Sequence, residues 1–471
     1  MSFEVRDLVT WWRDAGIDVV VRDAAGASID PPSRLLARAA YDHRQCDGQT
    51  MFCAVQGEST HGVRFLRDAF AAGVAVALVE GRAPILDDVG GVVLEVPDAR
   101  VALATAASEW LRVHDPVVVG ITGSNGKTTT KDFLAAALAG DRAAVASPGN
   151  LNSRWGMPAA ILGFSGDEDV LVLEMGASGP DEIGRLARIA PPWMGCITNI
   201  GPAHLEFFGS VDEVARTKGQ LVEALPPNGV AVLNRDDPRF ESLRARSGAR
   251  NVISFGTDSA ADLRVESVES VDAGIAVRIG GVEGVLPVFG TVNAINAAAA
   301  MAMAEALGVR REDALARIGA ATLSPHRSRR LAAAGRTLID DSYNANPASV
   351  REALGSLAAT RGVRRIAVLG EMAELGADAV AMHREVLGVA LESGLDRVVV
   401  LGASYAAAAE GAEDPRIVRF DREEPAEIAA WLQTSTAEGD VVLFKGSRSA
   451  ALERILDAFV EGVADPVEGI D

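Results

Sequence analysis

The stretch "GITGSNGKTTTKDFL" (Gly120–Leu134) decides the fold, because it has the composition of a phosphate-binding loop that leads from a strand into a helix. An apolar run, "DPVVVGITG", precedes the glycines, and the helical sequence "KTTTKDFLAAALAG" follows them. A glycine-rich turn in this position points backbone N–H groups into one concavity, and the helix N-terminus adds partial positive charge. The sequence therefore predicts a nucleotide-binding α/β domain. The alternative is a tight glycine turn followed by a surface lysine.

The glycine spacing of this loop differs from the common Walker pattern. That pattern requires a glycine where this sequence has Ile121, and the glycines here are Gly120, Gly123 and Gly126. We still expect Lys127 to neutralise the β- and γ-phosphates of ATP and the Thr128 hydroxyl to ligate Mg²⁺. The loop residues predicted to bind the nucleotide are Gly123, Ser124, Asn125, Gly126, Lys127, Thr128 and Thr129.

Composition limits the class of protein. The chain has 471 residues, of which 48% are hydrophobic and only 5% aromatic, which favours several domains of alternating helices and parallel strands. The net charge of −20 argues against nucleic acid or an anionic membrane as the main partner. The longest apolar stretch, Ala69–Val79, is too short to span a bilayer, so we expect a cytoplasmic protein without stable membrane insertion.

The three cysteines, Cys46, Cys53 and Cys196, form no CxxC pair. A disulfide framework or a structural zinc site is therefore not expected. We interpret the cysteines as small buried residues and not as catalytic thiols.

The order of apolar runs predicts an α/β protein of three domains. Residues 1–110 have the pattern of a small mixed domain, with strands at Gln49–Gly57 and Gly73–Gly81 and helical spacing between them. Residues 111–322 predict a central parallel-sheet domain like a P-loop ATPase, with a short antiparallel appendix from Asp262 to Pro287. Residues 323–471 repeat the strand–helix alternation and predict a Rossmann-like domain.

Three polar side chains follow strands or begin helices of the central domain. Glu174 ends a buried apolar strand, at the edge where open α/β sheets bind ligands, which favours a functional carboxylate. His204 comes just after another strand and is equally consistent with a ligand, a helix cap or a packing residue. Lys218 lies on a helix, where the residue pattern alone predicts a solvent-facing side chain.

Eight motifs occur in order from residue 120 to residue 453. They are "GITGSNGKTTT", "NLNSRWGMP", "EMGASGPDEI", "TNIGPAHLEFFGS", "TKGQL", "DDSYNANP", "LGEMAELG" and "KGSRSAALE". Together they resemble the ATP-dependent Mur ligases, whose own phosphate loop has the glycine spacing seen here. "DDSYNANP" and "LGEMAELG" are most similar to the member that adds D-alanyl-D-alanine to UDP-MurNAc-tripeptide.

The resemblance implies amide-bond formation through an acyl phosphate. ATP would phosphorylate a substrate carboxylate, and an incoming amine would displace the phosphate. The catalytic residues implied are Lys127, Glu174, His204 and Lys218. Thr128 and Glu174 would hold one Mg²⁺, and His204 and Lys218 would hold a second Mg²⁺. Because an ammonium cannot ligate a cation, the resemblance also implies that Lys218 is carbamylated.

The resemblance assigns further binding residues, and we expect the protein to be a monomer. For the nucleotide they are Asn293, beside adenine, and Arg329 and Asp341. For the UDP-MurNAc-peptide and D-alanyl-D-alanine substrates they are Asp42, Arg44, Asn150, Asn152, Glu371, His383, Lys445 and Ser447.

The sequence departs from the family pattern in three places, and these departures motivate two alternatives. Val292 replaces the usual histidine before Asn293, and Ser328 replaces a glycine, so that Arg327 competes with Arg329 for the nucleotide. The N-terminal motifs are altered to "DHR" (Asp42–Arg44) and "STHGVRF" (Ser59–Phe65). The alternatives are a Mur-like paralogue that joins a different carboxylate and amine, and a non-catalytic ATP-binding protein.

Overall fold

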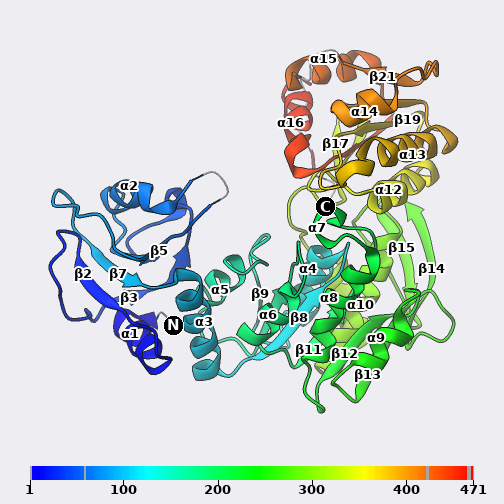
Figure 1. Ribbon diagram of the computed structural model, residues 1–471. Helices are drawn as coiled ribbons and strands as arrows, with labels where there is room; N and C mark the ends of the chain where they lie inside the picture. Colours follow the sequence, from blue (N-terminus) through cyan, green and yellow to red (C-terminus); the bar gives the residue numbers. More distant parts are fainter. Residues whose placement is uncertain (1–2, 58–59, 421–423, 464–467, 470–471) are drawn as a thin grey trace. The chain divides into compact units, whose positions relative to one another are not determined.

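A computed structural model describes residues 3–57, 60–420, 424–463 and 468–469 (Figure 1). The chain forms two compact units. The first unit contains the residues up to Gly120 together with Gly140–Ala177 and Asp181–Met194. The second unit contains Ile121–Ala139, Ser178–Pro180 and the chain from Gly195 onward. Both units combine helices with largely parallel sheets, so the predicted α/β class is confirmed. Among the described residues, no helix is both long and apolar enough to cross a bilayer.

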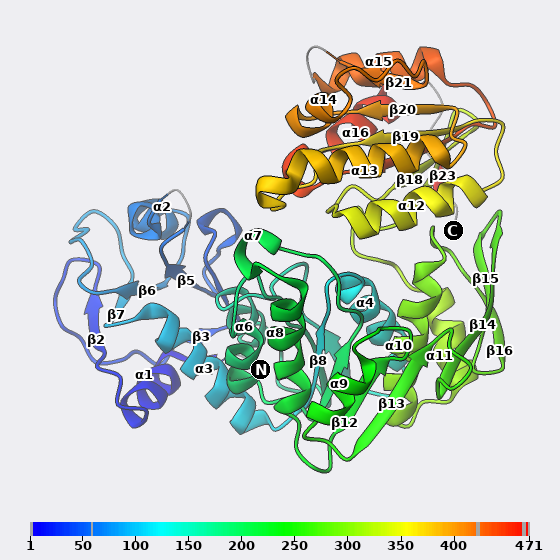
Figure 2. The same cartoon turned by 45° about the vertical axis from the view of Figure 1, so that its right-hand side comes forward.

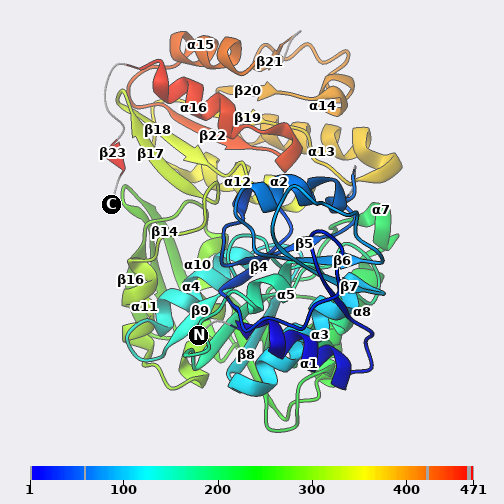
Figure 3. The same cartoon turned by 90° about the vertical axis from the view of Figure 1, so that its left-hand side faces the viewer.

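The N-terminal part of the first unit contains a five-stranded sheet with the order β2-β7-β6-β5-β4 (Figure 3). These strands are β2 (Val20–Asp23), β4 (Arg38–Ala40), β5 (Thr50–Ala54), β6 (Val76–Glu80) and β7 (Val92–Val96). Strands β4 to β7 run parallel, and β2 is antiparallel to β7. The predicted small mixed domain is therefore confirmed. The predicted strands at Gln49–Gly57 and Gly73–Gly81 appear as β5 and β6.

Helices of the first unit pack through small and aromatic side chains. Helix α3 (Ala99–His114) begins at Asp98, whose carboxylate accepts the N–H groups of Arg100 and Val101. Buried Trp12 of α1 (Val5–Asp14) donates its indole N–H to the Ala102 carbonyl at 2.7 Å. The same unit holds β9 (Ala144–Ala146) and β10 (Val170–Glu174), which pair in parallel. All five residues of β10 are buried, as the apolar run predicts.

The second unit contains the strands that follow the phosphate loop, in the order β16-β15-β14-β13-β12-β11. Their bounds are β11 (Met194–Ile197), β12 (Val230–Asn234), β13 (Asn251–Gly256), β14 (Leu263–Val271), β15 (Gly274–Ile279) and β16 (Val282–Leu286). Pairing is parallel from β12 to β14 and antiparallel from β14 to β16. The predicted antiparallel appendix is present, and it continues the sheet. Helix α4 (Lys127–Leu138) packs against α10 (Val292–Ala306) and α11 (Arg311–Gly319) (Figure 2).

The C-terminal part of the second unit is a separate sheet with the order β21-β20-β19-β22-β18-β17-β23. Its strands β17 (Arg329–Ala333) and β23 (Glu468–Gly469) pair antiparallel. Its parallel strands are β18 (Arg336–Asp340), β19 (Arg365–Leu369), β20 (Arg397–Val400), β21 (Ile417–Arg419) and β22 (Val441–Lys445). Its apolar residues form two clusters. One cluster includes α12 (Pro347–Ala359) and α13 (Ala379–Glu392), and the other includes α15 (Pro425–Ser435) and α16 (Glu453–Glu461). The second predicted strand–helix series is thereby confirmed.

Candidate active site

The phosphate loop is shaped by two glycines that no other residue could replace without a clash. A Cβ atom on Gly123 would lie 1.8 Å from the Thr198 hydroxyl, and one on Gly126 would lie 2.3 Å from Oδ1 of Asn296. Gly126 also has φ +80°, and it precedes the first residue of α4. The Lys127 ammonium donates to the Gly123 carbonyl at 3.0 Å, so the lysine folds back over the loop.

Residues that follow β11 form hydrogen bonds with the phosphate loop. The Asn199 side chain accepts the Asn125 N–H at 3.0 Å, and the Thr198 hydroxyl donates to the Asn125 carbonyl at 2.6 Å. Ser124 exchanges hydrogen bonds with both the N–H and the carbonyl of Gly201, each at 2.9 Å. The loop is therefore held in shape by side chains of the protein. Such preorganisation lets its N–H groups bind phosphate without further ordering.

His204 lies close to three charged side chains of the second unit, those of Lys127, Lys218 and Glu374. Burial lowers the pKa of His204, the nearby Lys127 and Lys218 lower it further, and Glu374 raises it. Lys127, His204 and Lys218 are thus close enough to interact, as three of the four predicted catalytic residues must be. His204 is the residue before α7 (Leu205–Phe208), but its side chain does not cap that helix. Its Nδ1 instead bonds the carboxylate of Glu374, from the segment after β19.

Lys218 is not solvent-facing, so the prediction from the helix pattern alone was wrong. It lies in α8 (Val211–Glu223) and is only 2% exposed. The residue pattern did not reveal this, because it does not show which face of the helix is covered by the rest of the fold.

Glu174 and Asn152 lie together in the first unit. The Asn152 amide donates to the Glu174 carboxylate at 2.7 Å, and the Ser147 hydroxyl accepts the Glu174 N–H at 3.2 Å. Glu174 is 2% exposed, which is rare for a carboxylate and indicates a role beyond solubility. Asn150 is exposed, and its carbonyl accepts the Asn152 N–H at 2.8 Å.

Two of the predicted Mg²⁺ ligands carry the oxygen atoms that this hard cation prefers. Thr128 in the second unit and Glu174 in the first unit are each buried. No group of three or more histidine, cysteine, aspartate or glutamate side chains gathers in the described ranges.

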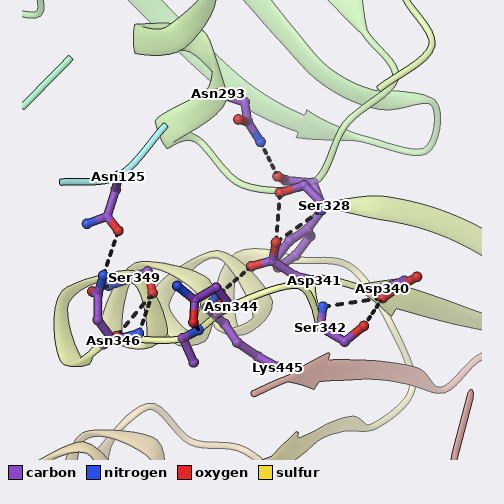
Figure 4. A network of polar contacts seen from close by, with 12 residues as sticks. Asn125, Asn293, Ser328, Asp340, Asp341, Ser342, Asn344, Asn346, Ser349 and Lys445 are labelled. Atoms are coloured by element: carbon purple, nitrogen blue, oxygen red, sulfur yellow. Dashed lines mark hydrogen bonds and ion pairs between the residues drawn. The ribbon is translucent and has the colours of Figure 1, made fainter. Parts of the chain in front are cut away.

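A polar network joins the phosphate loop to the C-terminal part of the second unit (Figure 4). Asn346, the residue before α12, donates from its amide to Oδ1 of Asn125 at 2.7 Å. Buried Lys445 donates to the Asp341 carboxylate at 2.7 Å, and Asp341 accepts the Ser328 N–H at 3.1 Å. Lys445 therefore fixes Asp341, which is predicted to meet the nucleotide.

The structure shows the surroundings of Asn293, which is predicted to lie beside adenine, and of the two arginines that compete for the nucleotide. Asn293 is 2% exposed, and its amide donates to the Phe289 carbonyl at 2.7 Å. The Arg327 guanidinium lies 3.9 Å from the ring centroid of Tyr343, and its Nε is buried without a hydrogen-bond partner in the described part of the chain. Arg329 is exposed at the start of β17 (Arg329–Ala333).

The segment after β19 is braced by residues that were predicted to bind substrate. The Ser404 hydroxyl bonds the Glu371 carboxylate, and buried His383 accepts the Met372 N–H at 2.9 Å. Ser447 donates its N–H to the Glu371 carbonyl at 2.9 Å. A cavity of about 770 Å³ lies against this segment, between residues 371–382 and 205–209. Its lining is acidic and includes Glu206, Glu371, Glu374 and Asp378.

The N-terminal candidates form a local pair. Asp42 accepts the Arg44 N–H at 3.1 Å and binds the Arg44 guanidinium at 2.8 Å. Ser59 of the altered "STHGVRF" motif lies outside the described residues, and His61 caps the following turn through Nδ1.

Cys53 and Cys196 are buried and free, as expected, and burial raises their thiol pKa values; Cys46 is half-buried.

Three functional candidates were missed from the sequence: Asn199, Asn346 and Glu374. Asn199 and Asn346 lie inside recognised motifs, so their polarity was visible, but their contacts with Asn125 were not. Glu374 also lies in a recognised motif, 170 residues from His204 along the chain. No local pattern can reveal such a contact.

The phosphate loop with Lys127, the buried Lys218 and the parallel sheet define a nucleotide-binding α/β protein of the P-loop type. Residues 121–304 match the Mur ligase middle domain, and residues 326–448 match the Mur ligase glutamate ligase domain. The chain belongs to the Mur ligase family and is a ligase.

Individual relatives share most of the chain. The UDP-N-acetylmuramoyl-tripeptide–D-alanyl-D-alanine ligase of Bacillus subtilis is 32% identical over 430 residues, covering 90% of this chain and 93% of the relative. The Escherichia coli enzyme of the same name is 32% identical, covering 94% of this chain and 97% of its own length. MurF of Acinetobacter baumannii superposes with a TM-score of 0.84 at 29% identity, covering 98% and 99% of the two chains. MurF of Thermotoga maritima, solved with ADP, has a TM-score of 0.78 at 29% identity, covering 90% and 97%.

Proposed function

We propose that this protein is an ATP-dependent, ADP-forming ligase that joins D-alanyl-D-alanine to UDP-MurNAc-tripeptide in the cytoplasm during peptidoglycan precursor synthesis. The observation that carries the proposal is the convergence of Lys127, His204 and Lys218 around a preformed phosphate loop. The relatives named for this reaction match at least 90% of the chain at about 32% identity, which supports the choice of substrates.

The reaction has two steps. The substrate carboxylate attacks the γ-phosphorus of ATP, so that the bond to ADP breaks and an acyl phosphate forms. The dipeptide amine then attacks the acyl carbon, the bond to phosphate breaks, and the amine loses its proton. Both steps bring anions together, so the site must supply positive charge and exclude water.

The side chains divide this work. Lys127 stabilises charge on the transferred phosphoryl group, and the loop N–H groups hold the β-phosphate. Thr128 and Glu174 would hold one Mg²⁺, and His204 with carbamylated Lys218 would hold another. Bound Mg²⁺ would supply further charge neutralisation. Asn293, Asp341 and an arginine would hold the nucleoside, and stacking on Tyr343 favours Arg327 over Arg329 for this arginine.

The substrates would occupy different parts of the chain. Asp42 and Arg44 would contribute to the UDP-MurNAc-peptide site, with Asn150 and Asn152 nearer the carboxylate. The dipeptide ammonium suits the acidic cavity beside Glu371, because opposite charges attract in a partly desolvated site. The dipeptide site would also include His383, Lys445 and Ser447. The protein would act as a monomer with three domains at 1–110, 111–322 and 323–471.

The experiment is a ligation assay that measures phosphate release with each substrate omitted in turn and identifies the product by mass spectrometry. We expect release to require ATP, the tripeptide nucleotide and D-alanyl-D-alanine. Release that does not depend on the dipeptide contradicts the proposal. Lys127→Ala and Lys218→Ala should each reduce the rate at least ~100-fold, whereas the exposed Arg361→Ala should not.

A second candidate is a paralogue with the same chemistry and a different carboxylate and amine. The altered motifs around Asp42 and His61 favour it, because this part of the family's chain binds the UDP moiety. A panel of nucleotide-linked peptides and amines, with products read by mass, separates the two. ATP binding without ATP turnover in the wild-type protein would instead indicate a non-catalytic ATP-binding protein, and wild-type activity in Lys127→Ala and Lys218→Ala would contradict the mechanism proposed above.

A further inference from the structure

We infer that Glu374 is a positioning residue for the ligase reaction: its carboxylate holds Nδ1 of His204 and turns Nε2 toward the reacting groups. The inference rests on the proposed function and adds a residue to it. Its starting point is the direct bond between His204 Nδ1 and Glu374 Oε2.

The bond determines which imidazole nitrogen carries the proton. A carboxylate only accepts hydrogen bonds, so Nδ1 must donate to it. In a neutral imidazole whose Nδ1 carries the proton, the lone pair lies on Nε2, the nitrogen that does not face Glu374. A histidine that binds a metal or accepts a proton uses this arrangement, with the second nitrogen fixed by a carboxylate.

The backbone at both ends of the bond is held in an uncommon conformation. His204 has φ +51° and Glu374 has φ +61°, values that side-chain-bearing residues adopt only at a cost in free energy. Such strain persists where the surrounding structure enforces it, and it concentrates at functional sites.

The segment that carries Glu374 is braced on both sides. Upstream, Ser404 holds Glu371 and His383 holds the Met372 N–H. Downstream, Leu375 is buried, and the turn at Gly376–Asp378 packs against α7, the helix that His204 precedes. Glu374 is therefore presented to His204 by a rigid support.

The contact also joins two parts of the second unit. His204 follows β11 near the phosphate loop, whereas Glu374 follows β19 of the C-terminal sheet. Lys127 and Lys218 lie on the His204 side. His204 thus reaches this orientation only when the C-terminal segment is in contact with it, which ties the imidazole geometry to docking of that segment.

The test combines NMR with kinetics on the full-length protein labelled with ¹⁵N-histidine. The His204 signals are assigned by their loss in His204→Gln, and spectra are recorded with Mg²⁺ and ADP. We expect wild type to show His204 protonated at Nδ1 alone. Glu374→Ala should give a mixture of tautomers, and Glu374→Gln, whose amide oxygen still accepts a bond from Nδ1, should keep most of the preference.

The kinetic readout separates positioning from folding. Glu374→Ala should lower kcat by about 10–100-fold while KM for ATP changes less than about twofold, and Glu374→Gln should recover much of kcat. The control is Glu385→Gln on α13, which removes an equivalent charge from the pair that Glu385 forms with Arg351 of α12. It should leave the tautomer and kcat unchanged.

An unchanged His204 tautomer in Glu374→Ala overturns the inference, as does an unchanged kcat. Equal losses in Glu374→Ala and Glu374→Gln together with a lowered thermal midpoint would indicate a structural role, which also overturns it. Failure of wild type to ligate the dipeptide, with the tautomer shift intact, would instead remove the proposed function.

Discussion

At the scale of single residues, Gly126 combines a left-handed backbone with a close approach to Asn296. In Gly126→Ala the new Cβ would meet Oδ1 of Asn296 at 2.3 Å, in addition to backbone strain of about 1–2 kcal/mol. We expect lower stability and loss of ADP binding, measured by urea unfolding and calorimetry. The control is Gly308→Ala, where φ is +92° and no atom lies within 4 Å of the new Cβ. Gly308→Ala should lose stability through backbone strain alone and keep the wild-type ADP affinity. Equal ADP affinities in Gly126→Ala and Gly308→Ala contradict the prediction.

His383 makes a pH-dependent contribution to stability. Burial lowers its pKa below the ordinary value of about 6.5, so below that pH the unfolded chain binds more protons than the folded chain. Stability is therefore fully present above pH ~6.5 and falls as the pH drops from that value through the folded pKa. We expect the thermal midpoint of wild type to drop between pH 7.5 and pH 5.5, and the drop to be smaller in His383→Gln. A drop of the same size in both proteins contradicts this assignment.

The candidate site was predictable from sequence where chemistry and strand ends coincide. Lys127, Thr128 and Glu174 follow from local patterns, because a glycine turn and an apolar strand each fix what comes next. The burial of Lys218 was not predictable from the sequence, since it depends on which helix face meets the sheet. Glu374 required the full fold, because a loop from another sheet supplies it.

At the scale of elements, α12 depends on Asn346 in two ways. The Asn346 side chain accepts the Ser349 N–H at 2.9 Å as a helix cap, and its amide donates to Asn125 of the phosphate loop. Serine caps helices as well as asparagine does but is too short to reach Asn125. In Asn346→Ser we therefore expect stability within about 0.5 kcal/mol of wild type and a weaker ADP affinity. Asn346→Ala should also lose about 1 kcal/mol of stability. Unfolding curves and calorimetry check both, and an unchanged ADP affinity in Asn346→Ser contradicts the coupling.

Element types were predicted well because buried parallel strands are continuous apolar runs of five or six residues. β8 (Val117–Thr122), β10 and β19 are of this kind. Short elements such as β9, three half-buried residues, carry too little pattern to be seen. Strand order also depends on pairings between residues far apart, such as β22 between β18 and β19.

At the scale of the whole molecule, nucleotide binding should stabilise two stretches of the second unit that lie far apart in the sequence. The Asn125–Asn346 bond connects the phosphate loop to α12, and the Asp341–Lys445 pair lies beside that helix. A ligand that orders the loop should therefore also stabilise the segment around α12, because both share one network. The N-terminal sheet takes no part in this network.

Hydrogen–deuterium exchange with mass spectrometry tests this coupling on the full chain. Addition of ADP and Mg²⁺ should slow exchange in residues 121–139 and in residues 336–359, and leave residues 50–96 unchanged. Asn346→Ser should keep the first protection and lose most of the second, since it removes the bond and preserves the helix cap. Lys127→Ala should lose both at the same ADP concentration, because it weakens binding itself. Protection that stops at the phosphate loop in wild type would show that the two stretches are energetically independent, and the network in Figure 4 would then be structural only.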